Sequence, residues 1–154
     1  MLNDSIIEIF DEKNKKCRLK QNEDDEVHFT VLNPTQRDIC FLAIDHCVFT
    51  KRDGFKKCDC AVFDKNTFCF IEIKDSTESS LSNRMKQGRD QLLSSIDKFA
   101  EQIDFENVRL EAYLCMGISD EINIPNLSSD LQKDLAFEMR NVELYRRTNK
   151  KEFL

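Results

Sequence analysis

The chain has 154 residues, of which 40% are hydrophobic and 34% charged, with a formal net charge of −6 at pH 7. This length suits a single domain, residues 1–154, that buries its core without a disulfide or a structural metal. No apolar run approaches the roughly 20 residues that a membrane span requires. The seven cysteines are an odd number for a disulfide framework, and no secretory signal is recognisable, so we expect a cytoplasmic protein.

The predicted elements follow one another with few breakers, because glycine and proline are scarce. Residues 3–13 have apolar spacing that fits a helix, although a strand also remains possible. Strands are predicted at residues 27–32, 40–49, 58–63, 68–74, 108–116 and 142–145. Helices are predicted at residues 80–105, where apolar side chains share one face, and at 130–139. This order predicts an α/β or α+β domain with one central sheet.

The run CDCAVFDKNTFCFIEIK at residues 58–74 is the most informative stretch, because a turn signal lies at its centre. With residues 65–66 in the turn, antiparallel pairing sets Asp59 directly opposite Glu72. Two carboxylates in such a pair repel each other, and apolar neighbours deprive them of water. Strand alternation places Lys74 on the same face as Glu72. We therefore expect one face of the sheet to present two acids and a lysine.

Two acids and a lysine on one patch suit a divalent cation and an activated water. Carboxylate oxygens bind Mg²⁺, and the bound ion polarises a phosphoryl oxygen and lowers the pKa of its water. A lysine orients that water or stabilises the developing charge. The alternative is a solvated strand face on which Asp59 merely pairs with the lysine. The nearly continuous apolar run at residues 68–73 argues against it, since such runs are typical of strands buried on both faces.

Asp59, followed by Glu72-Ile73-Lys74, a helix and another strand, resembles the PD-(D/E)XK nuclease superfamily over about half of the chain. The resemblance implies a restriction-endonuclease-like fold, a central mixed β-sheet flanked by helices, with its core at about residues 40–116. It implies that Asp59, Glu72 and the carbonyl of Ile73 are ligands of Mg²⁺ or Mn²⁺. Lys74 would then be the catalytic lysine.

Further positions compare with the family less directly. Gln91 resembles the helix glutamine that supports the site or contacts substrate in some branches. Many members also have an acid on their first helix, for which Glu8 is a candidate, and Asp45 is an alternative extra acid. The proline of the family's name is replaced here by Cys58, at a position that varies widely in the family.

The resemblance implies a metal-dependent nuclease that hydrolyses phosphodiester bonds, of DNA rather than RNA, in bacterial defence or repair. A sequence pI near 5.0 gives no general attraction for phosphate, so we expect help from local basic patches, a homodimer or a larger complex. The alternative is an inactive nuclease-like scaffold that serves as a protein-interaction subunit or immunity factor, with which the acidic pI agrees.

Basic residues that are candidates for phosphate contacts gather in residues 13–20, 51–57 and 146–151 and at Arg84, Lys86 and Arg89. The group at residues 84–89 is favoured, because it lies on the first turns of the long helix, close to the expected site.

His46, Cys47, Cys58 and Cys60 offer four donors for zinc, which would make a structural zinc site. Their spacing fits poorly, because a Cys-x-Cys run on a strand lacks the turn of a zinc knuckle. We expect Cys58 and Cys60 to be core residues and His46 to have a structural role.

Overall fold

The computed structural model describes residues 1–12, 17–45, 56–74, 81–115, 135–146 and 148–154. Its five-stranded sheet consists, in spatial order, of β4 (Cys40–Ala43), β5 (Cys60–Phe63), β6 (Thr67–Ile73), β7 (Arg109–Cys115) and β8 (Val142–Arg146). Its four-stranded sheet consists of β2 (Cys17–Leu19), β1 (Ile6–Asp11), β3 (Phe29–Leu32) and β9 (Lys150–Glu152). The long helix is α1 (Leu81–Ala100). The fold is therefore mixed α/β, with more strand than helix among the described residues.

The prediction of one central sheet is wrong, because the strands divide between two sheets. All six predicted strands are present, although β4 ends at Ala43 and the remainder of the predicted run lies partly outside the described residues. The ambiguous segment at residues 3–13 contains strand β1. Strands β2 and β9 were not predicted, since three residues are too few to show an alternating pattern.

The predicted long helix is present but shorter, because α1 ends at Ala100. Of the second predicted helix, residues 135–138 are helical, and the beginning lies outside the described residues. No helix in the described part of the chain is long and apolar enough to cross a membrane.

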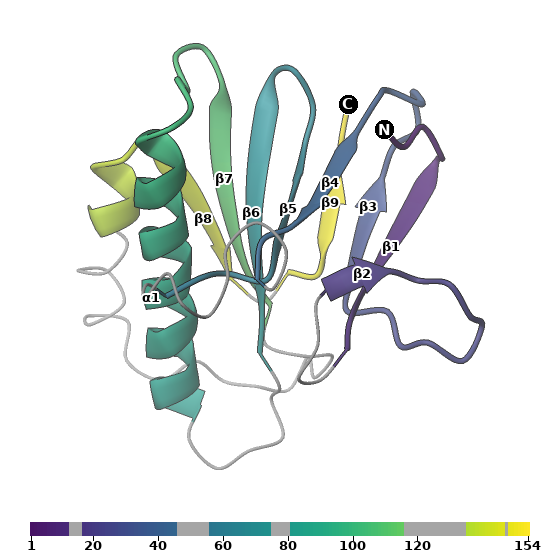
Figure 1. The fold of residues 1–154 in the computed structure, drawn as a ribbon, viewed down its shortest axis with the longest axis horizontal. Helices are drawn as coiled ribbons and strands as arrows, with labels where there is room; N and C mark the ends of the chain where they lie inside the picture. Colours follow the sequence, from purple (N-terminus) through teal and green to yellow (C-terminus); the bar gives the residue numbers. More distant parts are fainter. Residues whose placement is uncertain (13–16, 46–55, 75–80, 116–134, 147) are drawn as a thin grey trace.

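Three layers make up the fold, with the five-stranded sheet between α1 and the four-stranded sheet (Figure 1). Side chains of β6 alternate between the two neighbours: Phe68 and Phe70 belong to the core with α1, whereas Cys69 and Ile71 belong to the core between the sheets. Among the described elements only α1 is a long helix, so the expectation of helices flanking the sheet fails on the second face. Strands β1 and β3 cover that face, because their own alternation gives them an apolar side.

Burial of α1 follows from its apolar stripe. Met85, Leu92, Ile96 and Phe99 recur at helical spacing, and each is at most 6% exposed. Full burial of a large apolar side chain contributes roughly 1.5–3 kcal/mol. Burial of these four side chains therefore stabilises the packing of α1 against the five-stranded sheet.

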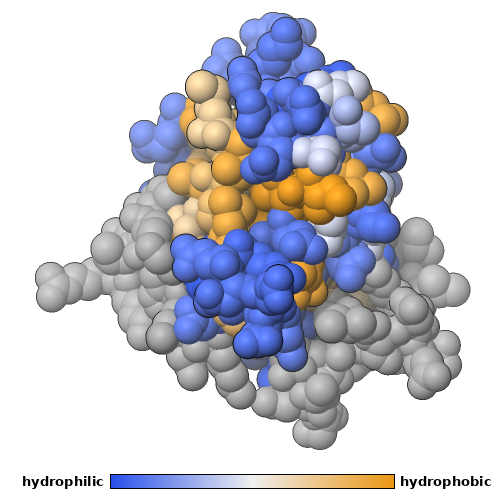
Figure 2. Space-filling model, turned by 90° about the vertical axis from the view of Figure 1, so that its right-hand side faces the viewer, coloured by the Kyte–Doolittle hydropathy of each residue, from blue (hydrophilic) through white to orange (hydrophobic). Residues whose placement is uncertain are grey.

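The outer face of the four-stranded sheet is less well covered than its inner face, which packs against the five-stranded sheet. Seen from that side, the surface carries a band of apolar side chains between polar regions (Figure 2). Ile6 at the start of β1 is 56% exposed, whereas its neighbour Ile7 is buried against the five-stranded sheet. Alternation along one strand therefore leaves an apolar residue facing outward.

Strands β5 and β6 pair antiparallel in the predicted register, with Ala61 opposite Phe70 and Phe63 opposite Phe68. Strands β6, β7 and β8 are parallel, so Ile73 and its partner Cys115 end at the same edge. The end of β6 and the start of β5 thus meet at one end of the sheet.

Candidate active site

Asp59 and Glu72 each accept a hydrogen bond from the backbone of the opposite strand. The N–H of Asp59 donates to Oε2 of Glu72 at 3.1 Å, and the N–H of Ile73 donates to Oδ2 of Asp59 at 2.7 Å. These two bonds orient both carboxylates at the end of the β5–β6 pair. The structure thus brings the two acids together, as the register predicts.

Lys74, the residue after β6, adds a positive charge to this pair. Its Nζ lies 3.0 Å from Oε1 of Glu72, and its N–H donates to the carbonyl oxygen of Cys115 at 2.8 Å. The side chain of Glu72 is 2% exposed and that of Lys74 is 17% exposed. The ion pair is therefore largely removed from water, and the charge of Lys74 also opposes the rise in the pKa of Asp59.

Two further carboxylates, those of Asp45 and Asp11, lie near enough to Asp59 for their charges to raise its pKa. The N–H of Asp45, just beyond β4, donates to the carbonyl oxygen of Asp59 at 3.3 Å. Asp11 ends β1 in the other sheet, and its charge is one of the causes that raise the pKa of Asp59. We call Asp11, Asp45, Asp59 and Glu72 the acidic cluster. It lies where the ends of the two sheets meet.

Asp11 is the site residue that the sequence reasoning missed. Ile7 and Ile9 on β1 are buried between the sheets, and Asp11 shares their face because strand residues two apart point the same way. Glu8, the acid considered instead, points to the opposite face, where its carboxylate lies 3.8 Å from Nζ of Lys20. The alternation of two isoleucines followed by an acid was the available signal, once residues 6–11 are read as a strand.

The carboxyl groups of Asp11, Asp59 and Glu72 are hard to ionise. Burial first, and then the charge of Asp11, raise the pKa of Asp59 to about 7. Burial and then the charge of Asp59 raise the pKa of Glu72 well above its ordinary value, although Lys74 opposes this. Burial also raises the pKa of Asp11. The cluster therefore favours either bound protons or a bound cation.

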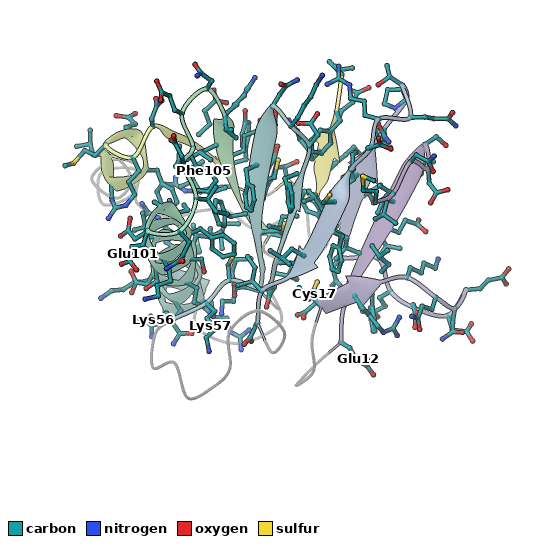
Figure 3. The ribbon with its side chains drawn as sticks, turned by 45° about the horizontal axis from the view of Figure 1, so that its top comes forward. Glu12, Cys17, Lys56, Lys57, Glu101 and Phe105 are labelled. Carbon is teal, nitrogen blue, oxygen red and sulfur yellow. The ribbon has the colours of Figure 1, made fainter. Side chains whose placement is uncertain are left out.

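Helix α1 holds the segment that leads into Asp59. Nε2 of Gln91 donates to the carbonyl oxygen of Lys57 at 3.1 Å, and the N–H of Cys58 donates to Oγ of Ser95 at 2.8 Å. Figure 3 shows Lys57 beside α1, at the end of the molecule opposite to Phe105. Gln91 thus supports the backbone before Asp59 in this structure, and Ser95, which the sequence reasoning missed, does the same.

Gly88 allows α1 to lie close to Glu72 and Lys74. A Cβ atom at this position would lie 2.5 Å from Cδ1 of Leu114, 3.4 Å from Cγ of Glu72 and 3.5 Å from Cε of Lys74. The first distance is shorter than any carbon contact permits, and Leu114 is fully buried. A glycine is therefore needed here for close approach, although it weakens the helix.

Replacing Gly88 with alanine is expected to lower the free energy of unfolding by up to about 2 kcal/mol. Overpacking against Leu114 costs about 1–3 kcal/mol, which exceeds the roughly 1 kcal/mol that alanine returns in helix propensity. Urea unfolding followed by circular dichroism measures the change. Combining Gly88→Ala with Leu114→Ala relieves the overlap, so the loss in the double variant should be clearly smaller than the sum of the two single losses. Additive losses would contradict the close approach.

The basic group predicted near the site is only partly available for phosphate. Arg89 is 1% exposed, and its guanidinium carbon lies 5.7 Å from the ring centroid of Phe137. A buried arginine does not reach a phosphate in solvent, so its inclusion in that group is wrong. Arg84 is half-buried and Lys86 is exposed, so these two stay candidates. Lys56 lies 3.3 Å from the carboxylate of Asp90.

The zinc alternative fails for the residues that can be placed. Cys58, which precedes β5, belongs to the core with α1, whereas Cys60 belongs to the core between the sheets, so the two thiols are buried in different cores. Burial raises the pKa of both thiols well above the ordinary value, which disfavours the thiolate that zinc requires. His46 and Cys47 lie outside the described residues.

The acidic cluster offers fewer converging donors than a fully protein-built Mg²⁺ or Mn²⁺ site. Within the described ranges, no three His, Cys, Asp or Glu side chains form a group with the closeness of a metal site. Glu72 faces Lys74 and Asp59 faces the N–H of Ile73. Mg²⁺ nevertheless needs only one or two carboxylates and completes its shell with waters. The carboxylate oxygens of Asp59 and Glu72 supply donors of the kind and number that this smaller requirement asks for.

Comparisons with known proteins add no relative. Neither the family models, nor the curated proteins, nor the solved structures gave a match to this chain. The candidate site therefore rests on its own residues and their geometry.

Proposed function

We propose that this chain is a nuclease that hydrolyses the phosphodiester bonds of nucleic acid, DNA rather than RNA, with a divalent cation. The observation that carries the proposal is the buried arrangement of Asp59, Glu72 and Lys74 at the end of the β5–β6 pair. The resemblance of these residues to the PD-(D/E)XK pattern supports the same conclusion. A role in defence against foreign DNA, or in repair, would suit such an enzyme.

Energetics support a functional reason for the acidic cluster. Burying a carboxylate costs several kcal/mol unless it is well compensated, and an acid opposite an acid adds repulsion. Here one ammonium group, that of Lys74, lies in contact with Glu72 while the pKa values of Asp11, Asp59 and Glu72 are all raised. A fold selected for stability alone gains more from apolar residues at these positions. Strongly perturbed pKa values of this kind are typical of functional sites.

Each residue has a distinct role in the proposed reaction. Asp59, Glu72 and the carbonyl of Ile73 would hold the cation, which supplies Lewis-acid activation of a phosphoryl oxygen and of a water. Lys74, held in place by Glu72, orients the attacking water or stabilises negative charge on the phosphoryl group. Gln91 positions the backbone that leads to Asp59.

Cleavage of plasmid and linear DNA tests the proposal. We expect products with Mg²⁺ or Mn²⁺ and none with a chelator, and Asp59→Asn should abolish them because it removes one ligand charge. Glu101→Gln, a change of an exposed acid directly after the end of α1 (Figure 3), is the control and should cleave like the unchanged protein. An RNA substrate in parallel decides between the two nucleic acids.

Absence of cleavage, together with absence of Mg²⁺ and Mn²⁺ binding in calorimetry, would overturn the proposal. That result would favour the scaffold, since a protein-interaction subunit or immunity factor needs neither. Cleavage that persists in Asp59→Asn would contradict the assigned site rather than the activity.

A further inference from the structure

Basic side chains from four parts of the chain share one groove between the sheets. The groove, of about 510 Å³, runs along β7, β8 and β9 and is lined by the basic residues Arg37, Arg109, Arg146, Lys150 and Lys151. Two carboxylates, Glu111 and Glu152, also line it. We call it the basic groove. The five cations outnumber these two lining acids, and two further acids, Glu143 and Asp64, pair with Arg109 and Arg37, so a small excess of positive charge remains in a chain of net charge −6.

Lys151 is anchored in the wall of the basic groove. Its Nζ lies 2.7 Å from Oε2 of Glu111, a residue that is 1% exposed, and the hydroxyl of Tyr113 donates to the same oxygen at 3.3 Å. Nε of Arg109 lies 3.4 Å from Oε1 of Glu111. One buried carboxylate thus holds two cations at the groove while it neutralises only one of them.

Three other cations of the groove, Arg37, Arg109 and Lys150, are at least partly exposed to solvent. Arg109 pairs with Glu143, and both side chains are more than half exposed, at 56% and 54%. Arg37 lies 3.4 Å from Asp64, and Lys150 forms no ion pair within the described part of the chain. An exposed ion pair such as Arg109–Glu143 contributes about 0–1 kcal/mol, so a phosphate group competes with it readily. Asp64 is only 5% exposed, so its pair with Arg37 is the stronger of the two.

The basic groove extends toward the acidic cluster. Arg109 begins β7 at the far edge of the sheet, whereas Thr148 lies where β7 ends, since the Sγ of Cys115 donates to the carbonyl oxygen of Thr148 at 3.2 Å. Cys115 in turn accepts the N–H of Lys74. Six residue steps along β7 at about 3.3 Å each give a length that admits several successive phosphates.

We infer that the basic groove binds the phosphodiester backbone of nucleic acid and leads it to the acidic cluster. The inference rests on the proposed nuclease function, and it names the surface that supplies affinity in a chain of acidic pI. Recognition there depends on charge and not on base identity, because the cations are the feature that the lining elements share.

Binding of a labelled 16-base-pair DNA duplex, and of its single strand, in chelator tests the inference without cleavage. The test variant combines Arg37→Ala with Lys150→Ala, two side chains whose loss leaves the buried Glu111 pair intact. At 50 mM salt we expect roughly a tenfold loss of affinity for each duplex phosphate contact removed, so about 100-fold for both. The slope of log K against log salt should become shallower by about 1.8 for the duplex.

A matched control removes the same charge elsewhere. Lys20→Ala with Lys98→Ala deletes two lysines outside the groove, one directly after β2 and one on α1, and should leave both the affinity and the salt slope unchanged. Equal losses in the two double variants would overturn the inference, because net charge alone would then explain them. The inference would also be overturned if poly-glutamate bound the unchanged protein as tightly as DNA does and failed to bind the Arg37→Ala, Lys150→Ala variant. That result would favour an acidic protein partner.

Failure of the inference and failure of the proposed function give different results. DNA cleavage that depends on Asp59 but not on Arg37 and Lys150 refutes the groove alone. Groove-dependent binding without any metal-dependent cleavage refutes the nuclease alone. Absence of DNA binding at 50 mM salt refutes the groove, whatever the cleavage result.

Discussion

Replacing Lys74 with methionine is expected to lower both DNA cleavage and stability. Cleavage should fall by about 10²–10³-fold, as when one electrostatic donor to a transition state is removed. The free energy of unfolding should fall by about 3 kcal/mol at neutral pH, because Glu72 would remain buried with an uncompensated charge. Product formation on gels and urea unfolding measure the two effects, with Lys98→Met on the exposed surface as the control.

A second substitution separates the two effects of Lys74. Adding Glu72→Gln to Lys74→Met removes the buried charge, so stability should return to within about 1 kcal/mol of the unchanged protein. Cleavage should stay at or fall below the level of Lys74→Met, because the ammonium group is not restored and Glu72→Gln also removes a proposed cation ligand. If the double variant were as unstable as Lys74→Met, the ion pair would not be the source of the loss. If Lys74→Met cleaved normally, Lys74 would have only a structural role.

Stability without metal is expected to fall as the pH rises from about 4 to 7. The pKa of Asp59 rises from an ordinary 3.8 to about 7 in the folded state, so the folded protein holds this proton more tightly than the unfolded chain does. The free energy of unfolding therefore decreases across that window and stays lower above it. The full shift corresponds to about 4 kcal/mol at most, and partial exposure of Asp59 reduces it to about 2–4 kcal/mol. Urea unfolding in chelator at a series of pH values measures the decrease.

Asp59→Asn is the control for this pH dependence, because asparagine carries no proton to lose. The difference in unfolding free energy between the unchanged protein and the variant should shrink or reverse between pH 4 and 7. Asp25 and Glu143 have lowered pKa values, so their contributions are gained below this window and cancel in the difference. A flat difference curve would contradict the raised pKa of Asp59.

Divalent cation should restore the stability that ionisation removes. Mg²⁺ at 100 times its dissociation constant stabilises a folded protein by about 2.7 kcal/mol, and the gain should grow with pH because the ligands must be deprotonated. Thermal unfolding with and without Mg²⁺ at pH 5 and pH 8 measures this. An equal shift at both pH values, or the same shift in Asp59→Asn, would place the ion elsewhere.

The sequence determined the central part of the site through local patterns. A turn signal between two apolar runs sets the register, and the register alone brings Asp59 opposite Glu72. Alternation along β6 then places Lys74 beside Glu72. The long helix was equally readable, because its apolar stripe repeats with the period of an α-helix.

Only the tertiary structure decided which other residues join the site. Asp11 comes from a second sheet, and the apolar spacing of its segment fitted both a helix and a strand, so the sequence left its direction open. In the sequence, nothing distinguishes Ser95 and Gly88 from other residues of the helix. Their roles depend on the packing of α1, which brings Ser95 to the segment before Asp59 and Gly88 to Leu114.

The division of the strands into two sheets was also decided by the tertiary structure and not by local sequence patterns. Pairing partners such as β3 and β9 lie more than 100 residues apart, and three-residue strands carry no periodicity that would reveal them. The basic groove combines Arg37, Arg109 and Lys151 in the same way. Local chemistry sets the register of one hairpin, whereas the meeting of distant strands depends on apolar faces that any of several partners could cover. For that reason the sequence determined the Asp59, Glu72 and Lys74 arrangement, and the packing of the two sheets decided what surrounds it.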